Sequence, residues 1–178
     1  MPELTPFSEA AHLFREFQYT AWRLETRGGY ASDRESPKWR RFVAGEDITN
    51  DPPNAWRENV ATQVGRGKRF ERVRVVDDPP TEGQLFLLAS GVGNVAAGED
   101  IRNISRADAR RLDLPEHDFW LFDSRLLMKF VFDDDDRTLG VELIDAQAEV
   151  LAACQARDAA WHHAVRTEEF TRRVRSPA

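Results

Sequence analysis

The residues best suited to chemistry are arginines and carboxylates that alternate with apolar residues along two short stretches, "TAWRLETR" and "RFERVRVV". This alternation is typical of half-buried strands. The charged positions on the side opposite the apolar residues are Arg23, Glu25, Arg72 and Arg74. If the strands are neighbours, these side chains meet on one face of a sheet. There they either pair with each other or hold an anionic ligand or an acidic peptide through guanidinium N–H donors.

Other polar residues lie where they could join this group. Arg102 shares the parity of the charged positions, and it is the weakest member because Ile104 lies on the same side of its strand. Asp100, His117 and Asp123 fall at candidate strand ends. His117 precedes Asp118 where the predicted strands of residues 119–143 begin, and it is the only histidine that we consider as an acid or base.

Several competing sites are weaker. The four aspartates in "FDDDDRTLG" are contiguous, and a calcium loop needs alternating oxygen ligands and a glycine, so a solvated turn is favoured over a metal site. "ASGVGN" contains G-x-G without a third glycine, which is weak evidence for a dinucleotide loop. The basic cluster in residues 66–74 is a candidate for nucleic-acid binding, but the net charge of −6 makes direct binding an unfavoured alternative.

Composition indicates one globular domain. The chain has 178 residues, 41% of them hydrophobic, and a single cysteine, which excludes an internal disulfide. No apolar run approaches the length of a membrane span, and the first residues lack a signal-peptide pattern. We therefore expect a cytoplasmic protein with no membrane association, no cofactor and no metal.

Periodicity predicts the elements that position these residues. The expected helices are about 6–17, 37–44, 54–64, 82–97, 105–112 and an Ala-rich helix over 145–165. The expected strands are about 20–27, 69–76, 99–104, 119–122, 126–132 and 138–143. Residues 1–178 are thus expected to form a single α+β domain, with an antiparallel sheet of about five or six strands and flanking helices. Residues 166–178 are expected to be a tail or a last helical turn.

Several longer strings carry a family resemblance: "RVRVVDDPPTE", "NVAAGEDIR", "LPEHDFWLFDSR" and "FDDDDRTLGVEL". Together with "FREFQYTAWRLETRGGY", they resemble DUF6879, an actinobacterial family described as a domain of unknown function, over residues 7–165. "FLLASGVGN" is less aromatic than that family's usual pattern. The polar positions that the resemblance implies are Arg74, Asn94, Glu99, Asp100, Arg102, His117, Asp118, Trp120, Asp123 and Arg125.

The resemblance implies a companion of helix-turn-helix regulators. Our first hypothesis is a non-catalytic intracellular regulatory or adaptor module that binds a protein partner, such as a helix-turn-helix transcription regulator. The alternative is an enzyme or small-molecule sensor that binds an anionic ligand through the arginine-lined sheet face, with His117 or Glu99 as acid or base if it is an enzyme. The predicted ligand- or partner-binding residues are Arg23, Arg72, Arg74, Asn94, Asp100, Arg102, Asp118, Trp120, Asp123 and Arg125.

Overall fold

The structure is a computed structural model and describes residues 4–175. Its strands are β1 (Thr20–Glu25), β2 (Arg69–Val76), β3 (Asp100–Ser105), β4 (Phe119–Phe122), β5 (Leu126–Phe132), β6 (Thr138–Ile144) and β7 (Val165–Arg166). Its helices are α1 (Phe7–Ala10), α2 (Leu13–Glu16), α3 (Ala31–Arg34), α4 (Pro37–Val43), α5 (Ala55–Gly65), α6 (Glu82–Ala97), α7 (Arg106–Arg111), α8 (Gln147–His163) and α9 (Thr167–Arg175).

The strands form one seven-stranded sheet in the order β6-β5-β4-β1-β2-β3-β7. The α+β class is as predicted, but the purely antiparallel sheet is wrong, because β1, β2 and β3 are parallel. Helices connect these three strands. A helical crossover brings the chain back to the end of the sheet where the previous strand began, so that the next strand runs in the same direction. From β4 to β6 the sheet is antiparallel, since tight turns join these strands. The first turn holds Asp123 and Ser124 at φ of 52° and 56°, as a two-residue hairpin turn requires.

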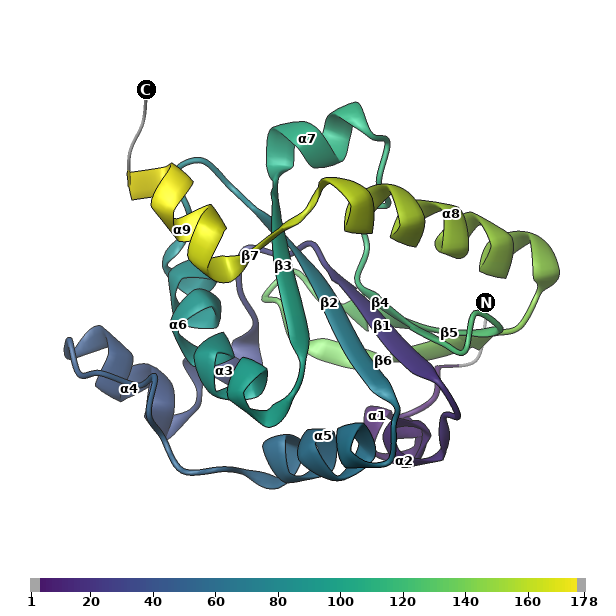
Figure 1. Cartoon of the computed structure of the whole chain (residues 1–178), viewed down its shortest axis with the longest axis horizontal. Coiled ribbons are helices and arrows are strands. Elements are labelled where there is room, and N and C mark those ends of the chain that lie inside the picture. The colour runs from purple at the N-terminus through teal and green to yellow at the C-terminus, as the bar shows by residue number, and fades with distance from the viewer. Residues whose placement is uncertain (1–3, 176–178) are drawn as a thin grey trace.

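Helices cover both faces of the sheet (Figure 1): α7 and α8 pack on one face, which we call the α8 face, and α1, α2, α5 and α6 lie on the other, the α5 face. The two faces have separate apolar cores. The core of the α8 face includes Trp22, Leu24, Val73, Phe119 and Leu121. The core of the α5 face includes Phe14, Val60, Phe70, Trp120 and Met128. The alternation along each strand therefore sends successive side chains into different layers.

Local departures from the predicted helices have identifiable causes. The first predicted helix is two short ones, and Thr5, just before it, pairs with Val141 on the edge strand β6 through two backbone hydrogen bonds of 2.9 Å. Helix α6 begins at a capping box between Thr81 and Gln84, as its sequence indicates. Helix α3, strand β7 and helix α9 were not predicted; α9 occupies the expected tail, of which residues 176–178 lie outside the described residues.

The four aspartates form the turn between β5 and β6, as predicted. Asp133 Oδ1 accepts hydrogen bonds from the backbone N–H groups of Asp135 and Arg137, both at 2.9 Å. Asp136 has a φ of 63° and accepts from Arg27 Nε at 2.7 Å. The turn is therefore tied to the segment that follows β1.

Among the described residues, none of the helices has the length and apolarity to cross a bilayer.

Candidate functional site

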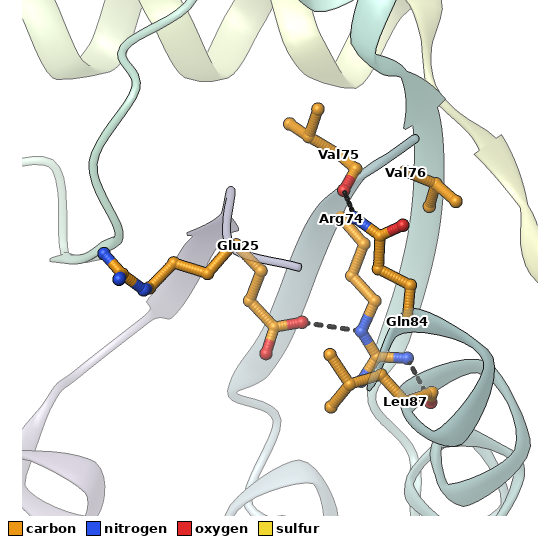
Figure 2. Close-up of a pocket in the computed structure, with 7 residues that line it drawn as sticks. Glu25, Arg74, Val75, Val76, Gln84 and Leu87 are labelled. Atoms are coloured by element: carbon orange, nitrogen blue, oxygen red, sulfur yellow. Dashed lines mark hydrogen bonds and ion pairs between the residues drawn. The ribbon is translucent and has the colours of Figure 1, made fainter. Parts of the chain in front are cut away.

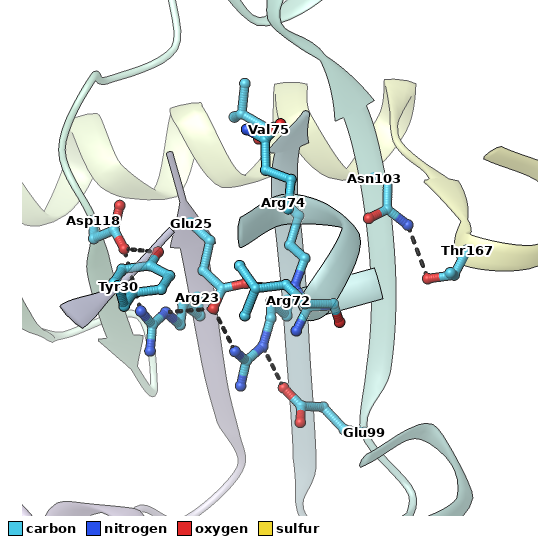
Figure 3. A network of polar contacts seen from close by, with 12 residues as sticks. Arg23, Glu25, Tyr30, Arg72, Arg74, Val75, Glu99, Asn103, Asp118 and Thr167 are labelled. Carbon is cyan, nitrogen blue, oxygen red and sulfur yellow. Dashed lines mark hydrogen bonds and ion pairs between the residues drawn. The ribbon is translucent and has the colours of Figure 1, made fainter. Parts of the chain in front are cut away.

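Three arginines and a glutamate meet where β1 lies beside β2. The parallel register places Arg23 opposite Arg72 and Glu25 opposite Arg74, and all four side chains lie on the α5 face (Figure 3). The Glu25 carboxylate accepts from Arg72 Nη1 and from Arg74 Nε, each at 2.6 Å. It also lies 3.5 Å from Arg23 Nε. One carboxylate thus contacts three guanidinium groups.

The environment of this network keeps Glu25 ionised. Glu25 is 3% exposed, and burial by itself would raise its carboxyl pKa. Arg72, Arg74 and Arg23 outweigh that effect, so the pKa of Glu25 lies below its ordinary range. Arg74 completes its bonding by donating Nη1 to the Leu87 carbonyl of α6 at 2.7 Å, and Figure 2 shows this contact beside the Glu25 carboxylate.

Two further carboxylates hold the sides of the network. Glu99 accepts from Arg72 Nε at 2.6 Å. Asp118 accepts from the backbone N–H and the hydroxyl of Thr26, each at 2.8 Å, from Arg23 Nη2 at 3.2 Å and from the Tyr30 hydroxyl (Figure 3). Burial and the Asp118 charge raise the pKa of the Tyr30 hydroxyl, which therefore stays protonated. Asp118 thus fastens the start of β4 to the chain after β1.

Aromatic rings support the arginines from the strands next to them. The Arg23 guanidinium carbon lies 4.9 Å from the centre of the Phe130 ring and 5.7 Å from that of Trp120. The guanidinium carbon of Arg72 lies 5.4 Å from the Trp120 ring. Such contacts stabilise a cation through the electron-rich ring face. The buried Trp120 ring, 1% exposed, therefore helps to position both Arg23 and Arg72.

A fourth arginine reaches the same region from helix α5 with different partners. Arg57 is 4% exposed and donates to Asn94 Oδ1 at 3.1 Å and to the carbonyls of Asp51 and Ser90 at 3.0 and 3.1 Å. No carboxylate of the described residues lies within salt-bridge distance of Arg57. Its buried charge is therefore bound by neutral oxygens alone.

Helix α6 makes room for two of these guanidinium groups with glycines. A Cβ at Gly91 would lie 2.7 Å from Arg74 Nη1, and a Cβ at Gly93 would overlap the Arg57 guanidinium. The glycines of "GVGN" therefore leave space on the helix surface for two arginine side chains. They lie inside α6 and do not form a dinucleotide-binding loop. This accounts for two residues that lower the intrinsic stability of a helix interior.

The side chains of the network line one cleft of about 700 Å³ on the α5 face. Its charged lining residues are Arg23, Glu25, Asp33, Lys38, Arg57, Arg72 and Arg74. Five cations thus face two carboxylates, whereas the whole chain carries a net charge of −6. Burial and then the charge of Glu25 raise the pKa of Asp33 to about 6. Carboxylates outside the lining compensate part of this charge: Glu99 pairs with Arg72, Asp118 with Arg23 and Asp51 with Lys38. Among the described residues, Arg57 is therefore the cation of the cleft without a carboxylate partner, and protonation of Asp33 below that pH makes the cleft more positive.

Not all predicted residues come to this cleft. Arg102 lies beside Val73 in the sheet and thus on the α8 face, where its guanidinium carbon is 3.7 Å from the Trp161 ring and Asp100 pairs with it at 3.3 Å. The predicted parity of Arg102 is wrong because β3 is buried on both faces, so that Ile101 and Ile104 point to opposite sides. Asn94 reaches the cleft through its bond to Arg57.

The remaining predicted residues lie elsewhere. His117 contacts Phe119 of the α8-face core, at 5.8 Å between rings, and burial followed by the charge of Lys129 lowers its pKa. Strands β1 and β2 separate it from Arg102, and Glu99 lies on the other face, so no acid–base pair with His117 forms here. Asp123 accepts from the backbone N–H groups of residues 18–20 at 2.7 to 3.0 Å, which is a structural contact. Arg125 is exposed.

Sequence reasoning missed four titratable residues of the cleft: Tyr30, Asp33, Lys38 and Arg57. An arginine or lysine on a short amphipathic helix normally faces solvent, and nothing in the helical period distinguishes Arg57 from such a residue. One signal could have found it. Two glycines inside a predicted helix indicate that another group approaches the helix closely, and that group is a pair of arginines.

The fold and the cleft define an α+β protein with a mixed sheet and a charged pocket on one face. Similar solved structures include Nuc from Salmonella typhimurium, a phospholipase D family member, with a TM-score of 0.51 and 11% identity over 89% of this chain and 90% of that chain. They also include NucT from Helicobacter pylori, with a TM-score of 0.52 and 8% identity over 93% of this chain and 97% of that chain. No curated protein matches. The model described as "Domain of unknown function (DUF6879)" matches residues 8–172, so the chain belongs to that family, as the resemblance predicted.

Proposed function

We propose that this protein binds a small anionic molecule in the cleft of the α5 face. The observation that carries the proposal is Arg57, a buried guanidinium whose partners are all neutral. A buried cation is costly unless an opposite charge compensates it. An anion in the cleft would supply that charge, and the cleft reaches Arg57 directly.

The other arginines have donors to spare. The hydrogen bonds among the described residues engage Nε and Nη1 of Arg72 and of Arg74, and neither Nη2 group takes part. Planar guanidinium groups bind carboxylate and phosphate through such N–H donors. Glu25 fixes both arginines in place, so little side-chain entropy would be lost on binding. The network is therefore suited to bind an anionic ligand as well as to stabilise the fold.

Phosphate is the first anion to test. Its tetrahedral oxygens can accept from several guanidinium groups at once. The name of one similar structure, a phospholipase D family member, points to phosphate-bearing molecules as well, although at 11% identity that likeness shows the fold alone. Catalysis on the bound ligand stays a prediction. A protein partner such as a helix-turn-helix regulator also stays a prediction, and co-purification of the two proteins would test it.

The test is thermal stabilisation by phosphate or pyrophosphate at constant ionic strength. A ligand that binds only the folded state raises the melting temperature with its concentration. We expect this with the native chain and a loss of most of the stabilisation in Arg57→Met and Lys38→Met. Arg125→Met, at an exposed position outside the cleft, is the matched control. Equal stabilisation of all four proteins, or none beyond that given by chloride, would exclude the proposal.

A further inference from the structure

The cleft has an aromatic side as well as a charged one. Phe7 lies 5.7 Å from Phe130 between ring centres, and Phe130 stacks on Phe132 at 5.7 Å with 16° between the ring planes. Tyr30 closes the row, 5.8 Å from Phe132. All four residues line the cleft. We call this row the aromatic shelf.

The aromatic shelf joins the arginine network directly. Phe130 lies under the Arg23 guanidinium, and Tyr30 shares Asp118 with that arginine. At the other end, Phe7 is 41% exposed although it belongs to a row of packed rings. An exposed ring that borders a charged cleft is the kind of surface that a ligand covers.

Polar groups beside the shelf narrow the chemistry. Ser32 and Thr138 are both exposed and line the cleft, and Thr138 lies opposite Phe132 in the sheet register. Hydroxyl groups next to aromatic faces suit a flat ring that carries heteroatoms at its edge. An alkyl chain would fill the space but leave these hydroxyls without partners from the ligand.

We infer that the ligand joins its anionic group to a planar heterocycle, as a mononucleotide does, with the ring on the aromatic shelf and the phosphate among Arg57, Arg72 and Arg74. This inference rests on the proposed function, because the shelf by itself holds no charge for a phosphate. A flat ring gains stacking with the exposed ring of Phe7, whereas the phosphate contacts are the same for any phosphate ester.

The experiment compares four probes by titration calorimetry: inorganic phosphate, ribose 5-phosphate, hexyl phosphate and adenosine 5′-monophosphate. We expect the nucleotide to bind roughly tenfold more tightly than ribose 5-phosphate, the gain expected from stacking one base. Phe7→Ala should remove most of that gain and leave the affinity for inorganic phosphate unchanged. Tyr19→Ala, at an aromatic residue that is 69% exposed and lines a different groove, is the matched control.

The outcomes separate the two proposals. Failure of every phosphate probe overturns the proposed function and this inference with it. Equal binding of ribose 5-phosphate and the nucleotide leaves the anion site in place and overturns the ring. Tighter binding of hexyl phosphate than of the nucleotide also overturns it, in favour of a lipid-like chain.

Discussion

Two groups of buried arginines in this protein are stabilised in opposite ways. Arg72 and Arg74 project from β2 onto carboxylates, at 2.6 Å in each of their three ion pairs. Arg57 projects from α5 onto an amide oxygen and backbone carbonyls. The two groups are equally buried, at 4% to 7% exposure. Burial alone therefore does not reveal whether a charge is part of the fold or available to a ligand.

This difference indicates that the sheet arginines and Arg57 have separate roles. The carboxylates of Glu25 and Glu99 neutralise the sheet arginines and make them a fixed floor for the cleft. Arg57, on helix α5, retains an uncompensated charge at the side of the cleft, which we call its wall. We therefore expect changes to the floor to affect mainly folding, and changes around Arg57 to affect mainly ligand binding. The following variants test that division.

The largest effect is expected from Glu25→Gln. This change keeps the shape of the side chain but leaves Arg23, Arg72 and Arg74 without the charge that they share. Breaking a buried ion pair by removal of one partner costs about 3 to 5 kcal/mol, and chemical denaturation at neutral pH would measure it. Glu142→Gln is the control, since Glu142 pairs with the partly exposed Lys129 at 3.7 Å and should change stability by less than about 1 kcal/mol.

The pH dependence of Glu25→Gln sharpens this prediction. The folded-state pKa of Glu25 is lowered, so its contribution is present above the ordinary carboxyl pKa and disappears as the pH falls toward the folded-state value. The stability difference between the native chain and the variant should therefore shrink on acidification. A difference that is constant with pH, or as small as that of Glu142→Gln, would mean that the floor does not depend on this charge.

A smaller effect is expected from Gly93→Ala. The added Cβ would overlap the Arg57 guanidinium, which four acceptors hold in place. Overpacking of this kind costs about 1 to 3 kcal/mol, which exceeds the gain in helix propensity of about 1 kcal/mol. The displaced guanidinium should also weaken phosphate binding. Thermal denaturation with and without phosphate measures both effects.

Gly65→Ala is the matched control for this change. Gly65 ends α5, and a Cβ there would meet nothing within 4 Å, so the variant should be as stable as the native chain or slightly more stable. Both variants replace a helical glycine with alanine, and they differ in the presence of an arginine. If they behave alike in stability and in phosphate binding, Arg57 is not confined as described.

The two arginine groups also differ in how far sequence could predict them. The alternation around Arg72 and Arg74 is local, so side-chain parity on β2 could be read from a few residues. The parallel order of β1, β2 and β3 could be inferred only by treating the intervening helices as crossovers. The α+β class and most elements followed from periodicity; strand direction depended on contacts between distant segments.

The rest of the cleft lay beyond local pattern. Arg102 was assigned to the wrong face because β3 is covered on both sides and has no polar face to read. Arg57 reaches the cleft only because α5 packs beside α6, at a site that Gly93 clears. Lys38 and Asp33 are held there by short helices whose placement depends on the packing of α3 and α4. Such residues require the tertiary arrangement to be known.

The smallest effect is expected from Asp33→Asn. Burial and Glu25 raise the pKa of Asp33 to about 6, from an ordinary value near 4, so its ionisation opposes folding. The penalty is absent below the ordinary pKa and complete above the folded-state pKa. Two pKa units correspond to about 3 kcal/mol, and solvent screening at the partly exposed Asp33 reduces this value. Asp33→Asn should therefore match the native chain near pH 4 and exceed its stability by about 1 to 2 kcal/mol at pH 8.

Sulfate binding offers a second measurement on Asp33, because the charge of sulfate is constant over this pH range. Ionised Asp33 would repel an anion in the cleft, so the affinity of the native chain for sulfate should fall as the pH rises through about 6. Asp33→Asn should bind sulfate with little pH dependence. A native chain whose sulfate affinity is flat between pH 5 and 8 would separate Asp33 from the anion site, even if the anion binds. The cations of the floor and of the wall would then act without a titrating neighbour.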